Sequence, residues 1–157
     1  MSGTRGLPQA DPIPGWCHAS NCPETGRRCP RWYSGFKADL DRIVDDLILS
    51  GSGRIALDLE TYGNRKGDGL DPWRGDIRLL TLCREDGPVW MLDLMAVGYD
   101  LGPLADILSV ATVIAHNAKF DLLWLRVKCG LRLPKVFCTL TAARLLAAGT
   151  KPGNNLD

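Results

Sequence analysis

Two acidic side chains interrupt an apolar stretch of the sequence, IALDLETY at 55–62. Successive side chains of a β-strand point to opposite faces, so Asp58 and Glu60 share one face and the aliphatic residues between them share the other. Like charges side by side repel each other, and carboxylates are rarely buried without a partner. We therefore expect a cation to bind at the face that carries these two acids.

A second acidic feature lies in HNAKFDLLWL at 116–125, where an apolar strand ends and a helix begins. Asn117 and Asp121 are four residues apart, which places them on one side of the first helical turn. A purely structural role is the alternative, because Asn117 suits a helix cap and Asp121 suits the positive end of the helix dipole. If the two segments are neighbours in a sheet, Asp58, Glu60 and Asp121 converge on one pocket. Three carboxylates favour Mg²⁺ or Mn²⁺ over zinc.

The elements that position these acids follow an α/β pattern. Apolar residues recur at helical spacing from 36 to 48, and the pattern ends at Gly51. Three consecutive strands then predict an antiparallel start, and the later half alternates strand and helix, which together predict a mixed sheet flanked by helices. Ligands gather near the carboxyl ends of strands in such sheets. We expect strands at 54–61, 77–84, 88–94, 112–116 and 136–139, helices at 101–110, 119–128 and 140–148, and a Gly-rich loop at 63–75.

The N-terminal residues 1–35 are rich in Pro, Gly and Cys and have no sustained period, so we expect an irregular segment before a single domain at 36–157. Three cysteines and a histidine in this segment could ligate zinc, with free thiols in a flexible arm as the alternative, because the paired CxxC spacing is missing. These residues are Cys17, His18, Cys22 and Cys29. The remaining cysteines, Cys83, Cys129 and Cys138, fall in apolar surroundings and are expected in the core.

The N-terminus has no apolar stretch like that of a signal peptide, and no apolar run approaches the roughly 18 residues that span a membrane. We therefore expect a cytoplasmic protein without membrane contact. Its charge is unevenly distributed: residues 36–60 hold six acids and three bases, whereas 117–156 hold one acid and seven bases. The basic half favours a polyanionic partner, with an ordinary solvated surface as the alternative. Its basic residues are Lys119, Arg126, Lys128, Arg132, Lys135, Arg144 and Lys151.

The motifs resemble those of the DEDD 3′-to-5′ exonucleases, in particular the proofreading domain of family A DNA polymerases, which serves DNA replication and repair, and the related ribonuclease D group. DLET at 58–61 resembles the first motif of the family, and HNAKFD at 116–121 resembles the second. GLDPWRGDIRLLTL at 69–82 and VFCTLTAARLL at 136–146 are similar to the stretches that follow these motifs. The resemblance runs from about residue 54 to the last residue and implies a ribonuclease H-like fold.

The chemistry that the resemblance implies is two-metal hydrolysis of the terminal phosphodiester at a single-stranded DNA or RNA 3′ end, with two Mg²⁺ or Mn²⁺ ions and release of 5′-mononucleotides. By match to the motifs, Asp58 would bridge the ions, Glu60 would hold the water on one metal, and Asp121 would support the second metal. Sequence alone does not distinguish DNA from RNA as the substrate.

The resemblance also implies a set of substrate-binding positions: Thr61, Leu70, Asn117 and Phe120. Phe120 matches a position beside the terminal nucleotide, where an aromatic ring can pack on any base; a core aromatic is the alternative. The segment NRKGDG at 64–69 looks inserted relative to the family pattern, which bears on whether Leu70 reaches the substrate.

The family's third motif, a Tyr or His followed four residues later by the last metal-binding Asp, would lie several tens of residues beyond 157. The resemblance therefore implies a domain truncated at its C-terminus, without the C-terminal helices of the full domain. Such a chain would be a fragment of a longer polymerase or nuclease, or a half completed by a second chain. The alternative is a catalytically inactive nucleic-acid-binding module of the same fold.

Overall fold

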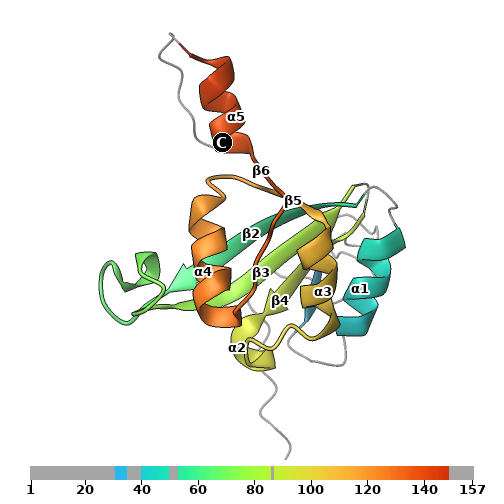
Figure 1. Cartoon of the computed structure of the whole chain (residues 1–157). Helices are drawn as coiled ribbons and strands as arrows, with labels where there is room; N and C mark the ends of the chain where they lie inside the picture. The colour runs from blue at the N-terminus through green and yellow to red at the C-terminus, as the bar shows by residue number, and fades with distance from the viewer. Residues whose placement is uncertain (1–30, 35–39, 50–52, 86, 149–157) are drawn as a thin grey trace, which may run out of the picture.

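The computed structural model describes residues 31–34, 40–49, 53–85 and 87–148 (Figure 1). Within these residues one six-stranded sheet has the order β1-β4-β3-β2-β5-β6. Its strands are β1 (Arg31–Ser34), β2 (Arg54–Tyr62), β3 (Asp76–Arg84), β4 (Val89–Asp93), β5 (Thr112–Ala115) and β6 (Val136–Cys138). The helices are α1 (Leu40–Leu49), α2 (Leu94–Val97), α3 (Pro103–Val110), α4 (Lys119–Cys129) and α5 (Thr139–Leu146), with the 3₁₀ turn η2 (Asp68–Leu70).

The sheet has antiparallel and parallel parts, as the sequence predicted. β2 pairs antiparallel with β3, and β3 pairs antiparallel with β4. On the other side of β2 the chain has crossed over through helices, so β5 runs parallel to β2 and β6 runs parallel to β5. β2 therefore lies inside the sheet, between an antiparallel and a parallel neighbour, and the predicted mixed α/β architecture is confirmed.

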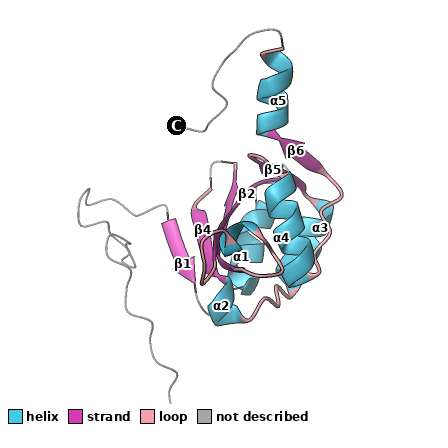
Figure 2. Ribbon diagram, turned by 90° about the vertical axis from the view of Figure 1, so that its left-hand side faces the viewer, coloured by secondary structure: helices cyan, strands magenta, loops and turns pink. Residues whose placement is uncertain are grey.

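The hydrophobic core lies on one face of this sheet. The side chains of β2 alternate along the strand, with Ile55, Leu57 and Leu59 buried and Ala56, Asp58 and Glu60 exposed. Figure 2 shows α1, α3 and α4 on one side of the sheet, where they cover the buried side chains. Removal of this apolar surface from water is the main term that stabilises the fold. The helices contribute Leu40, Ile43 and Leu47 from α1, Leu104 and Leu108 from α3, and Trp124 and Leu125 from α4.

Two elements were not predicted from the sequence. β1 lies within the range 1–35 that was expected to be irregular, and it pairs in parallel with β4 from Arg31↔Val89 to Ser34↔Leu92. Four residues are too few to show a period, and the strand depends on a partner almost sixty residues away in the sequence. The helix α2 is a single turn capped by Asp93, whose Oδ1 accepts a hydrogen bond from the Ala96 N–H at 3.1 Å. The other element boundaries agree with the prediction to within a few residues.

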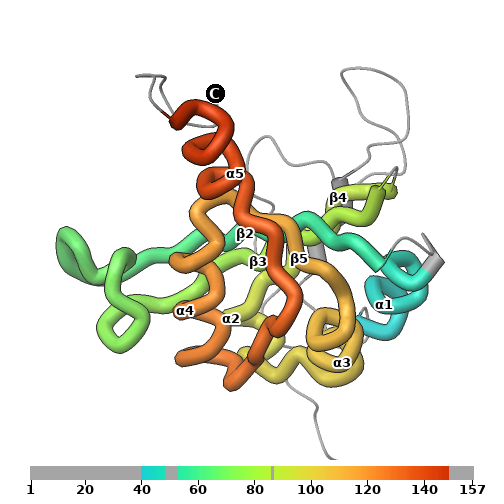
Figure 3. Tube along the Cα trace, turned by 45° about the horizontal axis from the view of Figure 1, so that its top comes forward, coloured from blue at the N-terminus to red at the C-terminus, as the bar shows by residue number. Residues whose placement is uncertain are grey.

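Helix α5 stands away from the sheet (Figures 1 and 3). None of its residues is buried, and Leu145 and Leu146 are among the exposed large apolar residues. Cys138 precedes this helix and is only half-buried, as are Cys83 and Cys129. Cys129 packs against the core as predicted, although it is only partly buried, whereas Cys83 and Cys138 are not among the core residues, so the prediction was wrong for these two. The predicted zinc ligands Cys17, His18, Cys22 and Cys29 lie outside the described residues.

No helix in the described part of the chain is both long and apolar enough to cross a membrane.

Candidate active site

β2 presents the two acids of the first motif to solvent. Asp58 and Glu60 are exposed, while Leu57 and Leu59 on the opposite face are buried, so the predicted alternation is confirmed. The pairing of β2 with β3 shifts register between Glu60 and Thr61. Such irregularities bend a strand and change the direction of the side chains beside them. The bend lies directly after the acids, at the carboxyl end of the strand.

α4 brings Asp121 to the same region. β5 lies beside β2, with Ala56 opposite Ile114, and the chain passes from β5 through a turn at 116–118 into α4. Asp121 is in the first turn of this helix, and its side chain is buried at 3% exposure. The motifs at 58–61 and 116–121 are neighbours because β2 pairs with β5, as the predicted metal site requires.

The environment of Asp121 changes its acidity. Burial, and after it the negative charge of Asp58, raises the pKa of Asp121 from 3.8 to about 7. Hydrogen bonds from the backbone N–H groups of Asp121 itself and of Leu59 act in the opposite direction. The electrostatics therefore join one acid from β2 with one acid from α4.

The donor chemistry at this position fits a hard divalent cation. Asp58, Glu60 and Asp121 offer carboxylate oxygens, and within the described residues none of the three makes an ion pair with Lys or Arg. The arrangement is nevertheless not a preformed three-ligand cage, since no group of three or more His, Cys, Asp or Glu side chains in the described ranges is placed to hold a metal ion. The charge of Asp58 acts on Asp121, and the binding of a metal by Asp58, Glu60 and Asp121 stays a prediction.

Asn117 does not cap α4 with its side chain, so that interpretation was wrong. The N-cap position is Ala118, which makes no side-chain cap hydrogen bond, and the carbonyl of Asn117 accepts from the Phe120 N–H at 2.9 Å. The backbone of Asn117 has φ 54°, in the left-handed region, and its side chain is exposed. Asn117 thus precedes the first helical turn, so the helical spacing that was expected to align it with Asp121 does not apply. Strained residues of this kind cluster at functional sites.

Thr61, near the end of β2, and Leu70, in the loop that follows it, are two of the predicted substrate residues. The Thr61 hydroxyl donates a hydrogen bond to the Gly69 carbonyl at 2.6 Å, so it fixes the loop to the end of the strand. Leu70 is 76% exposed. Leu70 is thus free to contact a ligand, whereas the hydroxyl of Thr61 already has a structural partner.

Phe120 has the mixed environment that its two interpretations describe. It is partly buried and packs against the core, where its ring centroid lies 5.9 Å from that of Trp124 at an interplanar angle of 54°. This tilted arrangement is favourable for aromatic pairs. Packing on Trp124 fixes the position of the Phe120 ring. Contact of its exposed part with a nucleic-acid base stays a prediction.

A hydrogen bond that the sequence did not reveal connects the second motif to α5. His116 Nδ1 and Thr139 Oγ1 are 2.9 Å apart, and the same hydroxyl is 3.4 Å from the Ala115 carbonyl oxygen, to which it donates. This contact fixes the turn before α4 against the start of α5. The two residues are far apart in the sequence and belong to different elements, so only the pairing of β5 with β6 brings them together.

The basic half of the chain divides into free and engaged cations. Lys119, Arg126 and Arg132 are exposed. Lys128 pairs with Asp76 at 2.8 Å, and Lys135 donates to the Val110 carbonyl at 3.2 Å. The engaged lysines stabilise the fold, and the exposed cations remain available to a polyanion. Lys151 lies outside the described residues.

Known proteins similar to this chain are nucleases. The family model described as 3′-5′ exonuclease matches residues 38–157. No curated protein matches the chain at a significant level. Among solved structures, one described as the apo form of the nuclease is 26% identical with a TM-score of 0.61, over 80% of this chain and 56% of that one. NrnC from Brucella melitensis is 27% identical with a TM-score of 0.57, over 68% of this chain and 50% of that one.

A further solved structure, the Trypanosoma brucei RNase D complex with GMP, is 18% identical with a TM-score of 0.61, over 74% of this chain and 35% of that one. At this identity the likeness concerns the fold alone, which is ribonuclease H-like as expected. The chain thus spans between 35% and 56% of the length of these three solved structures.

Proposed function

Because the chain belongs to the 3′-5′ exonuclease family, we propose that its domain hydrolyses the terminal phosphodiester at the 3′ end of DNA or RNA. The observation that supports this proposal is the burial of Asp121 in α4 together with the electrostatic effect on it of Asp58, which is exposed on β2. Two acids that repel each other cost stability unless a cation lies between them or a proton neutralises one of them. A metal-dependent nuclease uses such a pair to bind its ions at the scissile phosphate.

The residues proposed to hold two Mg²⁺ or Mn²⁺ ions are Asp58, Glu60 and Asp121. When bound, such ions neutralise the phosphate and supply an activated water. The chain's own contribution is positional: β2 and α4 fix the carboxylates, the Leu59 N–H bonds to Asp121, and Trp124 packs behind Phe120. A structure bound to Mg²⁺ exists for NrnC from Brucella melitensis, which supports the same choice of metal here.

The substrate is proposed to be a single-stranded 3′ end that approaches over the exposed face of β2. Leu70 and Phe120 would contact the terminal base, Asn117 would help to place it, and the exposed cations Lys119 and Arg126 would attract the phosphates. Thr61 would act mainly through the loop that it fixes. If the substrate is DNA, we propose a proofreading role in DNA replication and repair. If the substrate is RNA, we propose a role in RNA turnover. A cytoplasmic location is proposed with either.

The experiment is a nuclease assay on 5′-labelled single-stranded DNA and RNA with Mg²⁺ or Mn²⁺. We expect products shortened stepwise from the 3′ end, release of 5′-mononucleotides, and loss of this activity in Asp58→Ala. The 157-residue chain alone is expected to be nearly inactive, since the family's third motif is not among its residues. The assay therefore includes a longer polypeptide that supplies a YxxxD or HxxxD segment. Absence of hydrolysis by the longer polypeptide would overturn the proposal.

The second candidate function is a nucleic-acid-binding module that does not cut. It is favoured by one observation, namely that no three-ligand metal group is formed within the described residues. The two functions differ in their metal dependence. A binding module should hold oligonucleotides with equal affinity in Mg²⁺ and in EDTA, and Asp58→Ala should then increase that affinity by removing a negative charge.

A further inference from the structure

The loop between β2 and β3, residues 63–75, is folded around a buried acid. Asp68 is only 8% exposed, and its two carboxylate oxygens have separate partners. Oδ2 accepts a hydrogen bond from the Arg65 N–H at 3.0 Å, and Oδ1 lies 3.4 Å from Arg74 Nε. The backbone closes further turns, with Leu70 N–H donating to the Gly67 carbonyl at 3.0 Å. The loop therefore holds itself in one shape.

Close backbone contacts fix this shape against the end of β2. A Cβ atom at Gly75 would lie 2.3 Å from the Asp68 carbonyl oxygen, and one at Gly63 would lie 2.2 Å from the Asp68 Cβ. Only glycine fits at these two positions. Together with the hydrogen bond from Thr61 to Gly69, these contacts join both ends of the loop to its centre. A loop with this many internal contacts is a built platform and not a solvated linker.

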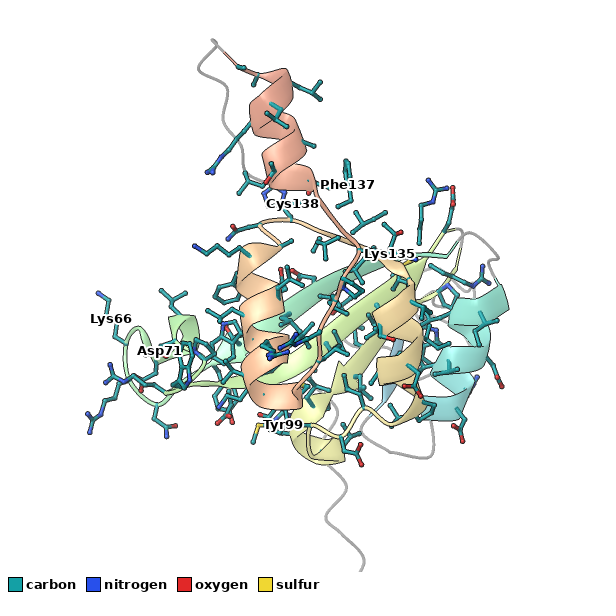
Figure 4. The ribbon with its side chains drawn as sticks, in the orientation of Figure 1. Lys66, Asp71, Tyr99, Lys135, Phe137 and Cys138 are labelled. Atoms are coloured by element: carbon teal, nitrogen blue, oxygen red, sulfur yellow. The ribbon has the colours of Figure 1, made fainter. Side chains whose placement is uncertain are left out.

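What the platform presents is apolar and cationic. Trp73 is 70% exposed, and its backbone N–H bonds to Asp71 Oδ1 at 2.9 Å, which fixes the residue although its ring is in water. Within the described residues the indole has no aromatic or cation–π partner. Arg65 and Lys66 are exposed on the same loop, and Figure 4 shows Lys66 at its outer end. An exposed aromatic ring beside cations is suited to a ligand that carries both ring systems and negative charge.

We propose that Trp73 stacks on a base of the single strand that lies 5′ to the terminal nucleotide, while Arg65 and Lys66 contact its phosphates. This inference rests on the proposed function, because Asp58 as a metal ligand would mark the position of the 3′ end of the bound nucleic acid. In the sheet Tyr62 is opposite Asp76, four residues beyond Asp58. At about 3.3 Å per residue, the base of the loop is roughly 13 Å from the acid. Leu70 in the same loop is the residue proposed to contact the terminal base, and Trp73 follows it by three residues, which suits Trp73 to a base further along the nucleic-acid strand.

The charges of the loop favour nucleic acid over a protein partner. Both carboxylates of the loop are engaged: Asp68 is buried against Arg74, and Asp71 accepts from the Trp73 N–H. The three bases Arg65, Lys66 and Arg74 outnumber the two acids, so the loop carries a net positive charge, which complements a phosphate backbone. An exposed tryptophan next to cations is the combination that binds single strands without reading their sequence, since every base offers a π-face. The loop projects past α4 in two views (Figures 1 and 3), and Trp73 is one of its exposed residues.

The test measures binding of fluorescently labelled single-stranded oligonucleotides by anisotropy in EDTA, so that the readout does not depend on metal or hydrolysis. With an oligonucleotide of about 12 nucleotides, we expect Trp73→Ala to weaken binding about tenfold and Trp73→Phe to retain most of the affinity. With a dinucleotide, which on this proposal ends before it reaches Trp73, Trp73→Ala should leave the affinity unchanged. The matched control is Val110→Ala, another exposed apolar residue, at the end of α3. Circular dichroism verifies that each variant is folded.

The basic residues give a second readout. The double variant Arg65→Gln, Lys66→Gln should lower the slope of log affinity against log salt by about 1 to 2 for the longer oligonucleotide and not for the dinucleotide. Equal losses for both ligands, or no loss for either, would overturn the inference. A change of oligomeric state in Trp73→Ala with unaltered oligonucleotide affinity would also overturn it and assign the loop to a protein contact. If oligonucleotide binding depends on Trp73 but the longer polypeptide does not hydrolyse nucleic acid, the inference about Trp73 holds and the proposed nuclease function is wrong.

Discussion

The strand β2 and the helix α4 each supply acids to the candidate active site, and they hold them in opposite environments. Asp58 is exposed to water on β2, because a strand with one face on the core directs every second residue outward. Asp121 is buried on α4, at a place where the helix lies on the sheet. The same functional group therefore has a pKa raised to about 7 in the helix, chiefly by burial.

This difference shows what a metal ion would do for the protein. An exposed carboxylate loses little when no ion is present, since water screens its charge. A buried carboxylate beside a second acid must remain protonated or bind a cation. The buried Asp121 of α4 would thus gain most from the positive charge of a metal ion. The exposed Asp58 of β2 would hold the ion where it can contact solvent and substrate.

Removal of the exposed acid is expected to have the largest effect. Asp58→Ala should lower the affinity for Mn²⁺ tenfold to a hundredfold, because it removes one of the two acids that meet at the site. Isothermal titration calorimetry measures this affinity directly. Asp106→Ala, which removes an exposed acid from α3, is the matched control and should bind Mn²⁺ as the parent does. Equal affinities of Asp58→Ala and the parent would rule out the metal site.

Neutralisation of the buried acid should change stability with pH. Because folding raises the pKa of Asp121, the unfolded chain ionises first, and the carboxyl reduces stability as pH rises from about 4 to about 7. Asp121→Asn removes this loss. Without metal, the variant should be more stable than the parent by about 1–3 kcal/mol at pH 8 and nearly equal to it at pH 4.

Urea unfolding at the two pH values in EDTA provides the measurement, with Asp106→Asn as the control for an exposed acid. A gain that is the same at both pH values would assign the effect to packing of the amide and not to the charge of Asp121.

The smallest expected effect is the direct coupling of the two acids. Burial is the first cause of the raised pKa of Asp121 and the charge of Asp58 is the second. Asp58→Asn should therefore lower the pKa of Asp121 by less than about one unit, and Glu60→Gln should change it less. Carboxyl carbon chemical shifts followed by NMR across the pH range report this pKa. If Glu60→Gln changed the pKa of Asp121 more than Asp58→Asn did, Glu60 and not Asp58 would be the β2 acid that acts on α4.

The sequence by itself determined the alternation of β2, the mixed sheet and the two acidic motifs. These features depend on local periods and on spacing within one element, and the burial pattern of residues 54–62 follows from them. The short elements β1 and α2 were missed because they contain too few residues to show a period, and β1 exists through its pairing with β4. Asn117 was wrongly expected as the helix cap, because a left-handed residue does not follow helical spacing.

Tertiary structure alone decided which groups meet and how they are solvated. The pairing of β5 with β2 brings Asp121 to Asp58, and the packing of α4 on the sheet removes Asp121 from water. The contacts of Asp68 with Arg65 and Arg74 fix the Gly-rich segment that was predicted as a loop, and Trp73 is exposed on its surface. Periodicity records which side of an element a residue occupies, but proximity and burial depend on contacts between distant segments. Those contacts form only when the whole sheet does.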